Sequence, residues 1–298
     1  MLDNRLMQAL AAVVQEGGFE KAASRLHITQ SAVSQRIRSL EDAMGQPLLV
    51  RASPVRPTEA GQRLLAHYRR VRHLEDDLLA TFRSSSPSDA MDTPVVMPLA
   101  VNEDSLATWF LPVLRPFLAS RPVLLDIYTD DQEVTHALLR TGVVTGCISS
   151  LATPIQGCRC VPLGRMDYQC LATPQFVSRW FPHGVEEQAL RRAPAVTFNR
   201  KDLLHCRFAA LWGVEDNGFP PHYVPSSSQF VEMIRAGHAY GMVPHPQGNP
   251  LLHSGELIPL APHHAVPVSL YWHHWNLGTS LLEELSETLV QGCRKHLL

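Results

Sequence analysis

The residues from Phe19 to Gly45 constrain the fold of this 298-residue chain most, because they predict two helices joined by a tight turn. Apolar side chains recur at helical spacing in both helices, at Phe19, Ala22, Ala23 and Leu26 and then at Val33, Ile37 and Leu40. The two alanines allow another helix to approach the first one closely. Thr29 or Ser31 can cap the second helix by accepting a hydrogen bond from a backbone N–H.

The polar face of the second helix carries side chains that suit the major groove of DNA. A Gln amide can bond the edge of adenine, and an Arg guanidinium can bond guanine or a phosphate. The residues of this helix predicted to face DNA are Gln30, Ser31, Ser34, Gln35, Arg36 and Arg38. Spacing alone leaves open an ordinary amphipathic helix pair with a solvated polar face.

The segment after Gly45 predicts a wing beside this helix. Residues 47–51 predict a short strand, and residues 52–57, which include two prolines, predict a turn. Arg51 and Arg56 then lie where a wing meets the DNA backbone or the minor groove. The alternative is two exposed arginines on a loop.

A long helix is predicted from Thr58, which is a good N-cap residue, to residue 83. Its apolar side chains follow a spacing of four and three residues, at Leu64, Tyr68, Val71, Leu78 and Phe82, interrupted by Glu75 where another apolar residue is expected. No neighbouring domain is predicted to cover this stripe. Pairing with a second copy of the chain is therefore favoured over burial in a core.

The pattern changes after this helix. Residues 84–89, SSSPSD, predict a polar hinge. Beyond the hinge, short apolar strands alternate with helical segments through the rest of the chain. This alternation predicts an α/β domain with a mainly parallel sheet.

The segment AASRLHITQSAVSQRIRSLEDAMGQPLLVR, followed by RPTEAG, closely resembles the winged helix-turn-helix of LysR-type transcriptional regulators, and the resemblance runs from about Leu6 to Leu79. It implies an α+β multidomain protein: a winged helix-turn-helix at 1–57, a linker and dimerisation helix at 58–83, and a hinge at 84–92. Residues 93–298 would form a two-lobed α/β effector-binding domain that is similar to a periplasmic binding protein. One lobe would comprise 93–163 plus 267–298, and the other 164–266.

Within that family, the segments LAVNEDSLATWFLP, HSGELIPL and LYWHHW resemble the lysine/arginine-responsive, ArgP-like group of chromosome-replication-initiation inhibitors. The chemistry fits, because carboxylates at strand ends can hold a cationic side chain and a helix start can receive an α-carboxylate. We expect Asp130 and Asp131 to hold the cation and the helix opened at Ser105 to receive the carboxylate. The full set of candidate effector-binding residues is Asn102, Asp104, Ser105, Asp130, Asp131, Ser149, Ser228 and His245. For each acid, the alternative is a helix cap or a solvated loop.

Charge and composition agree with a DNA-binding head on an acidic rear domain. Residues 1–83 hold 12 basic and 9 acidic residues, whereas the remainder holds 14 basic and 19 acidic ones. No secretory signal or membrane span is predicted, and the six cysteines form no CxxC. We therefore expect a cytoplasmic protein with reduced thiols, acting as a homodimer on promoter DNA with a small effector. The family resemblance leaves a dimer of dimers open and adds RNA polymerase as a candidate partner.

No enzyme, metal site or cofactor is predicted. The sequence contains no GxSxG, HExxH, Walker or Rossmann motif. The pairs His263-His264 and His273-His274 cannot readily share a metal, since adjacent residues of a strand point to opposite faces. The alternative function is a nucleoid-type architectural protein that binds DNA with little sequence preference. The Gln- and Ser-rich face favours a regulator, because phosphate binding alone needs only Lys and Arg.

Overall fold

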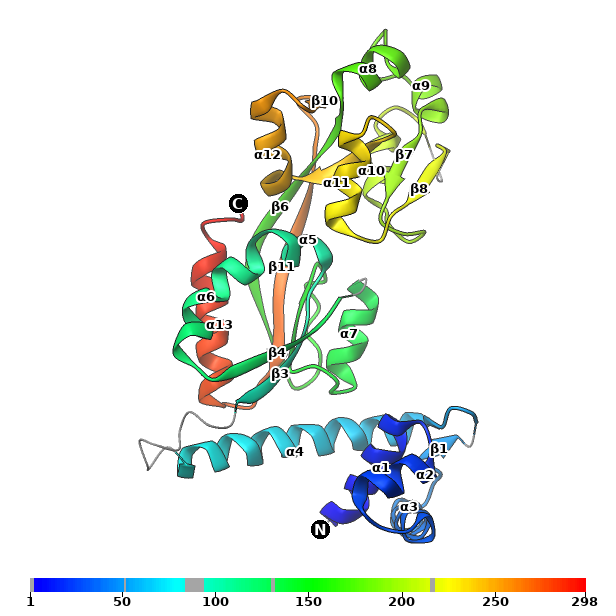
Figure 1. Ribbon diagram of the computed structural model, residues 1–298, viewed down its shortest axis with the longest axis vertical. Coiled ribbons are helices and arrows are strands. Elements are labelled where there is room, and N and C mark those ends of the chain that lie inside the picture. Colours follow the sequence, from blue (N-terminus) through cyan, green and yellow to red (C-terminus); the bar gives the residue numbers. More distant parts are fainter. Residues whose placement is uncertain (1–2, 51, 84–93, 130–131, 215–217) are drawn as a thin grey trace.

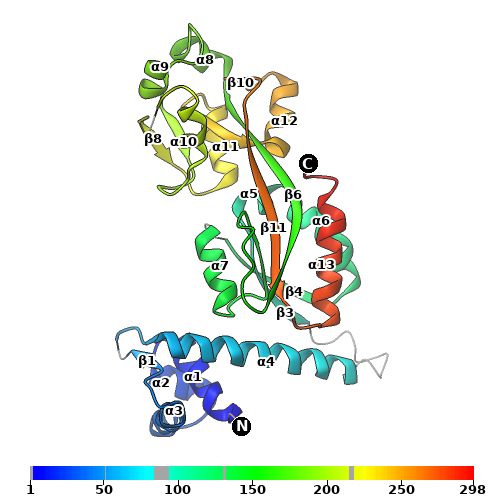
Figure 2. The same cartoon turned by 180° about the vertical axis from the view of Figure 1, so that it is seen from behind.

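The computed structural model describes residues 3–298 apart from residues 51, 84–93, 130–131 and 215–217. It consists of a small helical head, a long helix, and a larger α/β domain (Figures 1 and 2). Arg51, Asp130, Asp131 and the predicted hinge lie outside the described residues.

The head forms because three amphipathic helices bury their apolar faces against one another. Its elements are α1 (Asn4–Glu16), α2 (Phe19–Leu26), α3 (Gln30–Met44) and the antiparallel strands β1 (Leu49–Val50) and β2 (Arg56–Pro57). The centre of this core contains Leu10, Val13, Ala22, Val33 and Leu40, all at most 1% exposed. The two short strands are the predicted wing.

Helix α4 (Glu59–Arg83) is 25 residues long; it begins at the wing and extends away from the head (Figure 1). Thr58 caps it as predicted, because the Thr58 hydroxyl accepts a hydrogen bond from the Gly61 N–H at 3.1 Å. Leu65 and Tyr68 pack into the core of the head. The C-terminal half of α4 keeps large apolar side chains in solvent, with Leu78 56% exposed.

The α/β domain is built around one sheet of nine strands. Its first half contains β3 (Val95–Ala100), α5 (Glu103–Ser105), a π-helical turn (Leu106–Phe110), α6 (Leu111–Ser120), β4 (Val123–Tyr128), α7 (Gln132–Arg140) and β5 (Gly146–Ser149). After the long strand β6 (Cys158–Ala172), the second half contains α8 (Pro174–Trp180), α9 (Glu187–Arg192), β7 (Ala195–Thr197), α10 (Leu204–Ala210), β8 (Pro221–Tyr223), α11 (Ser227–Arg235), β9 (Tyr240–Pro244), α12 (His245–Ser254) and β10 (Ile258–Pro259). The chain returns through β11 (Ala265–Trp275) and ends with α13 (Ser280–Cys293).

The sheet is mixed, whereas the sequence predicts a mainly parallel one. Strands within each half pair in parallel, β3 with β4 and β5, and β7 with β8 and β9. The long strands β6 and β11 run antiparallel to each other and to their neighbours, because one carries the chain into the second half and the other brings it back. The predicted lobe boundary at 163–164 falls inside β6, and the boundary at 266–267 falls inside β11.

Helices cover both faces of the sheet in the first half. Helices α6 and α13 lie side by side on one face, and α7 lies on the other (Figures 1 and 2). A continuous core around Trp109, Phe110 and Trp272, each 0% exposed, runs from this half into the second one. Among the described helices, none is both long enough and apolar enough to span a membrane.

Candidate functional site

The polar face of α3 lies on the surface of the head, as the sequence predicts. The Thr29 hydroxyl caps the helix by accepting a hydrogen bond from the Ala32 N–H at 3.2 Å, so of the two candidate caps it is Thr29 that closes the helix start. Gln30, Ser31 and Gln35 are exposed, and Ser34 is half-buried. Their amides and hydroxyls are therefore available to base edges.

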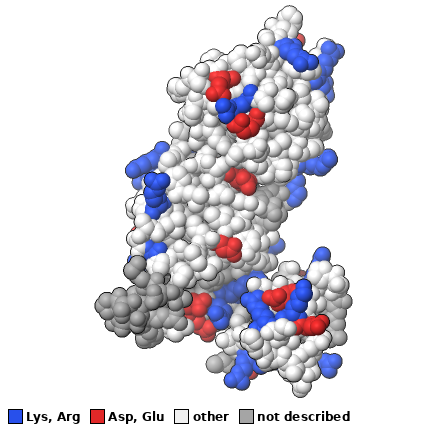
Figure 3. Space-filling model, in the orientation of Figure 1, with Lys and Arg blue, Asp and Glu red and all other residues white. Residues whose placement is uncertain are grey.

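Basic side chains flank this polar face. Arg38 and Arg56 are exposed and Arg36 is half-buried. Within the described part of the chain, none of the three has a carboxylate within ion-pair distance, so their charges are available to phosphates. Figure 3 shows charged side chains crowding the small head, whereas most of the visible face of the α/β domain is uncharged.

A second site lies between the two halves of the α/β domain. A cleft of about 820 Å³ is lined on one side by Asn102, Glu103 and Asp104 at the start of α5, and on the other by the segment 198–204 and Arg207. Side chains of β6 and β11, including Tyr168 and Tyr271, form its floor. The cleft therefore has walls from both halves, which is the arrangement expected of a ligand-binding α/β domain.

Asp104 is the centre of the polar groups in this cleft. The Tyr168 hydroxyl donates a hydrogen bond to Asp104 Oδ2 at 2.8 Å, and the Ser227 hydroxyl donates one to Oδ1 at 2.6 Å. Ser227 opens helix α11 of the second half and also lies 3.2 Å from Gln247 Oε1. Asp104 thus connects α5 in one half with β6 and with the start of α11 in the other.

The Asp104 carboxylate has no positive partner in the described residues. Burial raises its pKa, and the nearby carboxylates of Asp202 and Glu103 act in the same direction, against the hydrogen bonds from Ser227 and Tyr168. Two further polar atoms beside it, Asn102 Oδ1 and Ser105 Oγ, are buried without a hydrogen-bond partner among the described residues.

Some predicted effector residues do not line the cleft. Ser149 is 1% exposed and its hydroxyl accepts a hydrogen bond from the Leu151 N–H at 3.2 Å, so it shapes the loop beside the cleft. Ser228 and His245 are exposed at the surface. The prediction missed the buried hydroxyl at Ser227 by one position, because the side chain that faces inward at a helix start depends on the entry angle of the chain.

Sequence reasoning also missed the wall formed by residues 198–207. These residues follow strand β7, and Asp202 accepts hydrogen bonds from the backbone N–H groups of Phe198 and Leu204 at 3.1 and 2.9 Å. The candidates predicted from strand ends lie at the ends of β3, β4, β5 and β9, and none lies at the end of β7. Asn199 and Asp202 are the polar residues of the cleft that follow β7.

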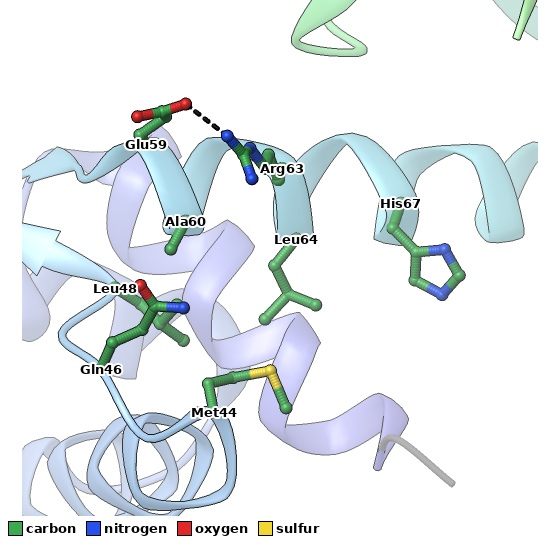
Figure 4. A pocket seen from close by; sticks show the side chains of 8 residues that line it. All are labelled: Met44, Gln46, Leu48, Glu59, Ala60, Arg63, Leu64 and His67. Atoms are coloured by element: carbon green, nitrogen blue, oxygen red, sulfur yellow. Dashed lines mark hydrogen bonds and ion pairs between the residues drawn. The ribbon is translucent and has the colours of Figure 1, made fainter. Parts of the chain in front are cut away.

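A groove of about 490 Å³ lies on the head between the end of α3 and the start of α4 (Figure 4). Leu48, Ala60 and Leu64 form its apolar floor, with Met44 at one side. Arg63 pairs with Glu59 at its rim.

The predicted separation of His273 and His274 holds. The His273 imidazole Nε2 lies 2.7 Å from the Leu151 carbonyl and 3.6 Å from Cys160 Sγ, whereas the His274 ring stacks on Trp272. Across the described ranges, no group of three or more His, Cys, Asp or Glu side chains is arranged to hold a metal ion.

Comparison with known proteins identifies both domains. Residues 4–62 match the model of the bacterial regulatory helix-turn-helix protein of the lysR family, and residues 98–294 match the LysR substrate binding domain. The chain is 46% identical to the HTH-type transcriptional regulator ArgP of Pseudomonas aeruginosa over 97% of its own length and 95% of that protein.

Two solved structures are similar over nearly the whole chain. ArgP from Mycobacterium tuberculosis is 37% identical, with a TM-score of 0.87 and 98% of each chain covered. Full-length LysG from Corynebacterium glutamicum with bound effector Arg is 31% identical, with a TM-score of 0.81 and 99% of each chain covered. These relatives are transcriptional regulators. The chain belongs to the LysR family and is a DNA-binding transcriptional regulator with an effector-binding domain.

Proposed function

We propose that this regulator acts on promoter DNA as a homodimer and that its effector is lysine or arginine, bound in the cleft around Asp104. The observation that carries the proposal is the half-buried Asp104 carboxylate, which has two hydrogen-bond donors but no cation among the described residues. A partly desolvated charge without a counter-charge is unfavourable, so a cationic ligand gains free energy by neutralising it.

The walls of the cleft suit the long side chain of a basic amino acid. Leu151 and Leu203, 42% and 59% exposed, lie on opposite walls and present apolar surface to the ligand space. The methylene groups of lysine or arginine can pack on these side chains while the charged end reaches Asp104. An acidic or short ligand would leave this apolar surface in water.

The ligand's α-carboxylate fits the second half of the domain better than the helix start beside Ser105. Glu103 and Asp104 occupy the first turn of that helix, and their negative charges oppose a carboxylate there. Arg207 lines the opposite wall and supplies a positive charge. The sequence-based assignment of Asp130 and Asp131 to the cation rests on residues that are not described, so Asp104 takes that role in this proposal.

Similarity to LysG supports the choice of ligand, since LysG is a relative with arginine bound as its effector. The experiment is isothermal titration calorimetry of the full chain with arginine and lysine. Citrulline and norleucine serve as controls, because they keep the side-chain carbons of arginine and lysine but carry no side-chain charge. We expect saturable binding of at least one basic amino acid and at least roughly tenfold weaker binding of its neutral analogue. Equal affinity for citrulline and arginine would contradict the proposal.

Homodimerisation is supported by the exposed surface of α4. His67, Val71, Leu74 and Leu78 lie on one face at spacings of four and three residues, in line with Ala60 and the buried Leu64 in the groove of Figure 4. A two-fold axis at Val71, the middle of the helix, places Leu64 opposite the partner's Leu78 and His67 opposite the partner's Glu75. The surface is therefore self-complementary, as a symmetric dimer requires. Pairing of dimers and contact with RNA polymerase stay predictions of the family resemblance.

A further inference from the structure

Helix α4 has a second face, which contacts the effector domain rather than the head. Ala66, Arg69, Arg70 and His73 follow the spacing i, i+3, i+4 and i+7, so they lie on one side of the helix. This side lies beneath the effector domain in both views of the molecule (Figures 1 and 2). It is distinct from the face that carries Leu64, Val71 and Leu78.

We propose that this face of α4 binds the C-terminal turn of α7 and Trp275, and that this interface couples the effector cleft to the orientation of the DNA-binding head. The coupling rests on the proposed effector function, whereas the interface itself does not. Three sets of contacts carry the proposal.

The first contact is a close approach of two backbones. Gly142 ends α7 with a φ of +74°, and a Cβ placed there would lie 3.0 Å from Ala66 Cα and 3.1 Å from Trp275 Cζ2. A side chain at this position would push against both neighbours, and the positive φ disfavours one independently. The pairing of a glycine with an alanine is what allows α4 to lie directly on the turn.

The second contact neutralises the end of a helix. The Arg69 guanidinium donates a hydrogen bond of 2.7 Å to the carbonyl of Thr141, directly after the last residue of α7. Carbonyl groups at a helix C-terminus lack intrahelical partners and carry partial negative charge. A charged donor from α4 is therefore a favourable partner for α7.

The third contact is shared by both elements. The Trp275 indole N–H donates to the Leu139 carbonyl in the last turn of α7 at 3.3 Å. Its ring lies 5.4 Å from the His73 ring and 5.4 Å from the Arg70 guanidinium carbon, which is within cation–π range. Trp275 is 1% exposed, so α7 and α4 together cover this large side chain.

Strand β11 connects this interface directly to the cleft. Tyr271 lines the cleft, and Trp275 lies four residues further along the same strand, which is roughly 13 Å of extended chain. A series of ring contacts also leads into α7, from Tyr271 to His273 at 6.5 Å and from His273 to His136 at 4.6 Å. A ligand that changes the position of Tyr271 therefore acts on both elements that hold α4.

The interface is tested by hydrogen–deuterium exchange of the full chain without added effector. Gly142→Ala places a methyl group against α4, and its matched control is Gly255→Ala, which has a similar φ of +76° but no atom within 4 Å of the added Cβ. Arg69→Met removes the bond to α7, and its control is Arg72→Met on another side of the same helix. We expect exchange in residues 66–73 and 141–145 to rise about tenfold in both test variants and to change less than about twofold in both controls, where tenfold corresponds to about 1.4 kcal/mol. Equal effects of test and control variants would overturn the interface.

The coupling is tested by DNA binding of the same four variants with and without arginine. We expect the ratio of the two affinities to approach one in Gly142→Ala and Arg69→Met and to stay at the parent value in the controls. Increased exchange with an unchanged ratio would overturn the coupling while the interface stands. If the parent itself does not respond to arginine or lysine, the proposed effector is wrong, and the exchange experiment still decides the interface.

Discussion

Replacing Asp104 by asparagine should separate effector binding from folding. The substitution keeps the shape of the side chain and removes its charge. In the free protein, burial raises the pKa of Asp104, so ionising it at neutral pH opposes folding. The Asp104→Asn substitution removes that penalty, and the hydroxyl groups of Tyr168 and Ser227 can each donate or accept a hydrogen bond to the amide. We therefore expect the free variant to be at least as stable as the parent.

The bound state should respond in the opposite direction. A hydrogen bond or ion pair to a charged group contributes about 1.5–3 kcal/mol, so the affinity for lysine or arginine should fall by about ten- to a hundredfold. Thermal unfolding with and without ligand measures both effects in one assay, because ligand binding raises the unfolding temperature by mass action. Glu103→Gln is the matched control, since Glu103 lines the same cleft with the same charge but is not bonded to Tyr168 or Ser227. If the ligand-induced rise in unfolding temperature falls equally in the Asp104→Asn and Glu103→Gln variants, Asp104 has no specific role in ligand binding. If the Asp104→Asn variant keeps the full rise, Asp104 has no role in ligand binding at all.

Three further predictions concern other parts of the chain. Gln35→Ala should weaken binding to a promoter site by about 1–3 kcal/mol with little effect on binding to random DNA. Arg56→Ala should weaken binding to both DNAs and reduce the salt dependence of the binding constant. Equal losses for Gln35→Ala on both DNAs would favour a nucleoid-type protein with little sequence preference. Val71→Glu should dissociate the dimer in sedimentation velocity while Arg72→Glu, on a different side of α4, should not, because only the first buries a carboxylate at the two-fold axis. Burial lowers the pKa of His205 to about 4 from the ordinary 6.5, so at pH 5 this histidine is protonated in the unfolded chain but neutral in the folded one. Urea unfolding should therefore show about 2 kcal/mol of stability lost between about pH 7.5 and pH 5, and His205→Phe should remove this loss. An identical pH dependence in the two proteins would contradict the prediction.

The head could be predicted almost completely from the sequence. The spacing of Val33, Ile37 and Leu40 determines which face of α3 is buried, so it also determines that Gln35 and Arg38 face outward. These relations lie within a few turns of one helix and depend on helical geometry alone. The order of strands and helices in the rear domain follows from similar local patterns.

The cleft could be predicted only in part. Asn102 and Asp104 line the cleft, as expected from the rule that polar residues at strand ends gather at one edge of a sheet. Tyr168 could not be found in this way, since it lies within the long crossing strand β6 and reaches Asp104 from 64 positions away. Ser228 and His245 lie at the surface outside the cleft for a related reason, because the orientation of α11 and α12 toward the first half depends on how the two halves close.

The sequence by itself determined the helices of the head, the polar face of α3, the long linker helix and the alternation of strands and helices behind it, because each depends on side chains that are near neighbours in the chain. Only the tertiary structure decided which polar groups meet in the cleft, as Ser227 and Asp104 do from positions 123 residues apart. It also decided that Ala66 of α4 lies against Gly142, since neither residue has a side chain whose chemistry indicates a contact. Contacts of this kind arise from the packing of whole elements, and no local pattern in the chain encodes them.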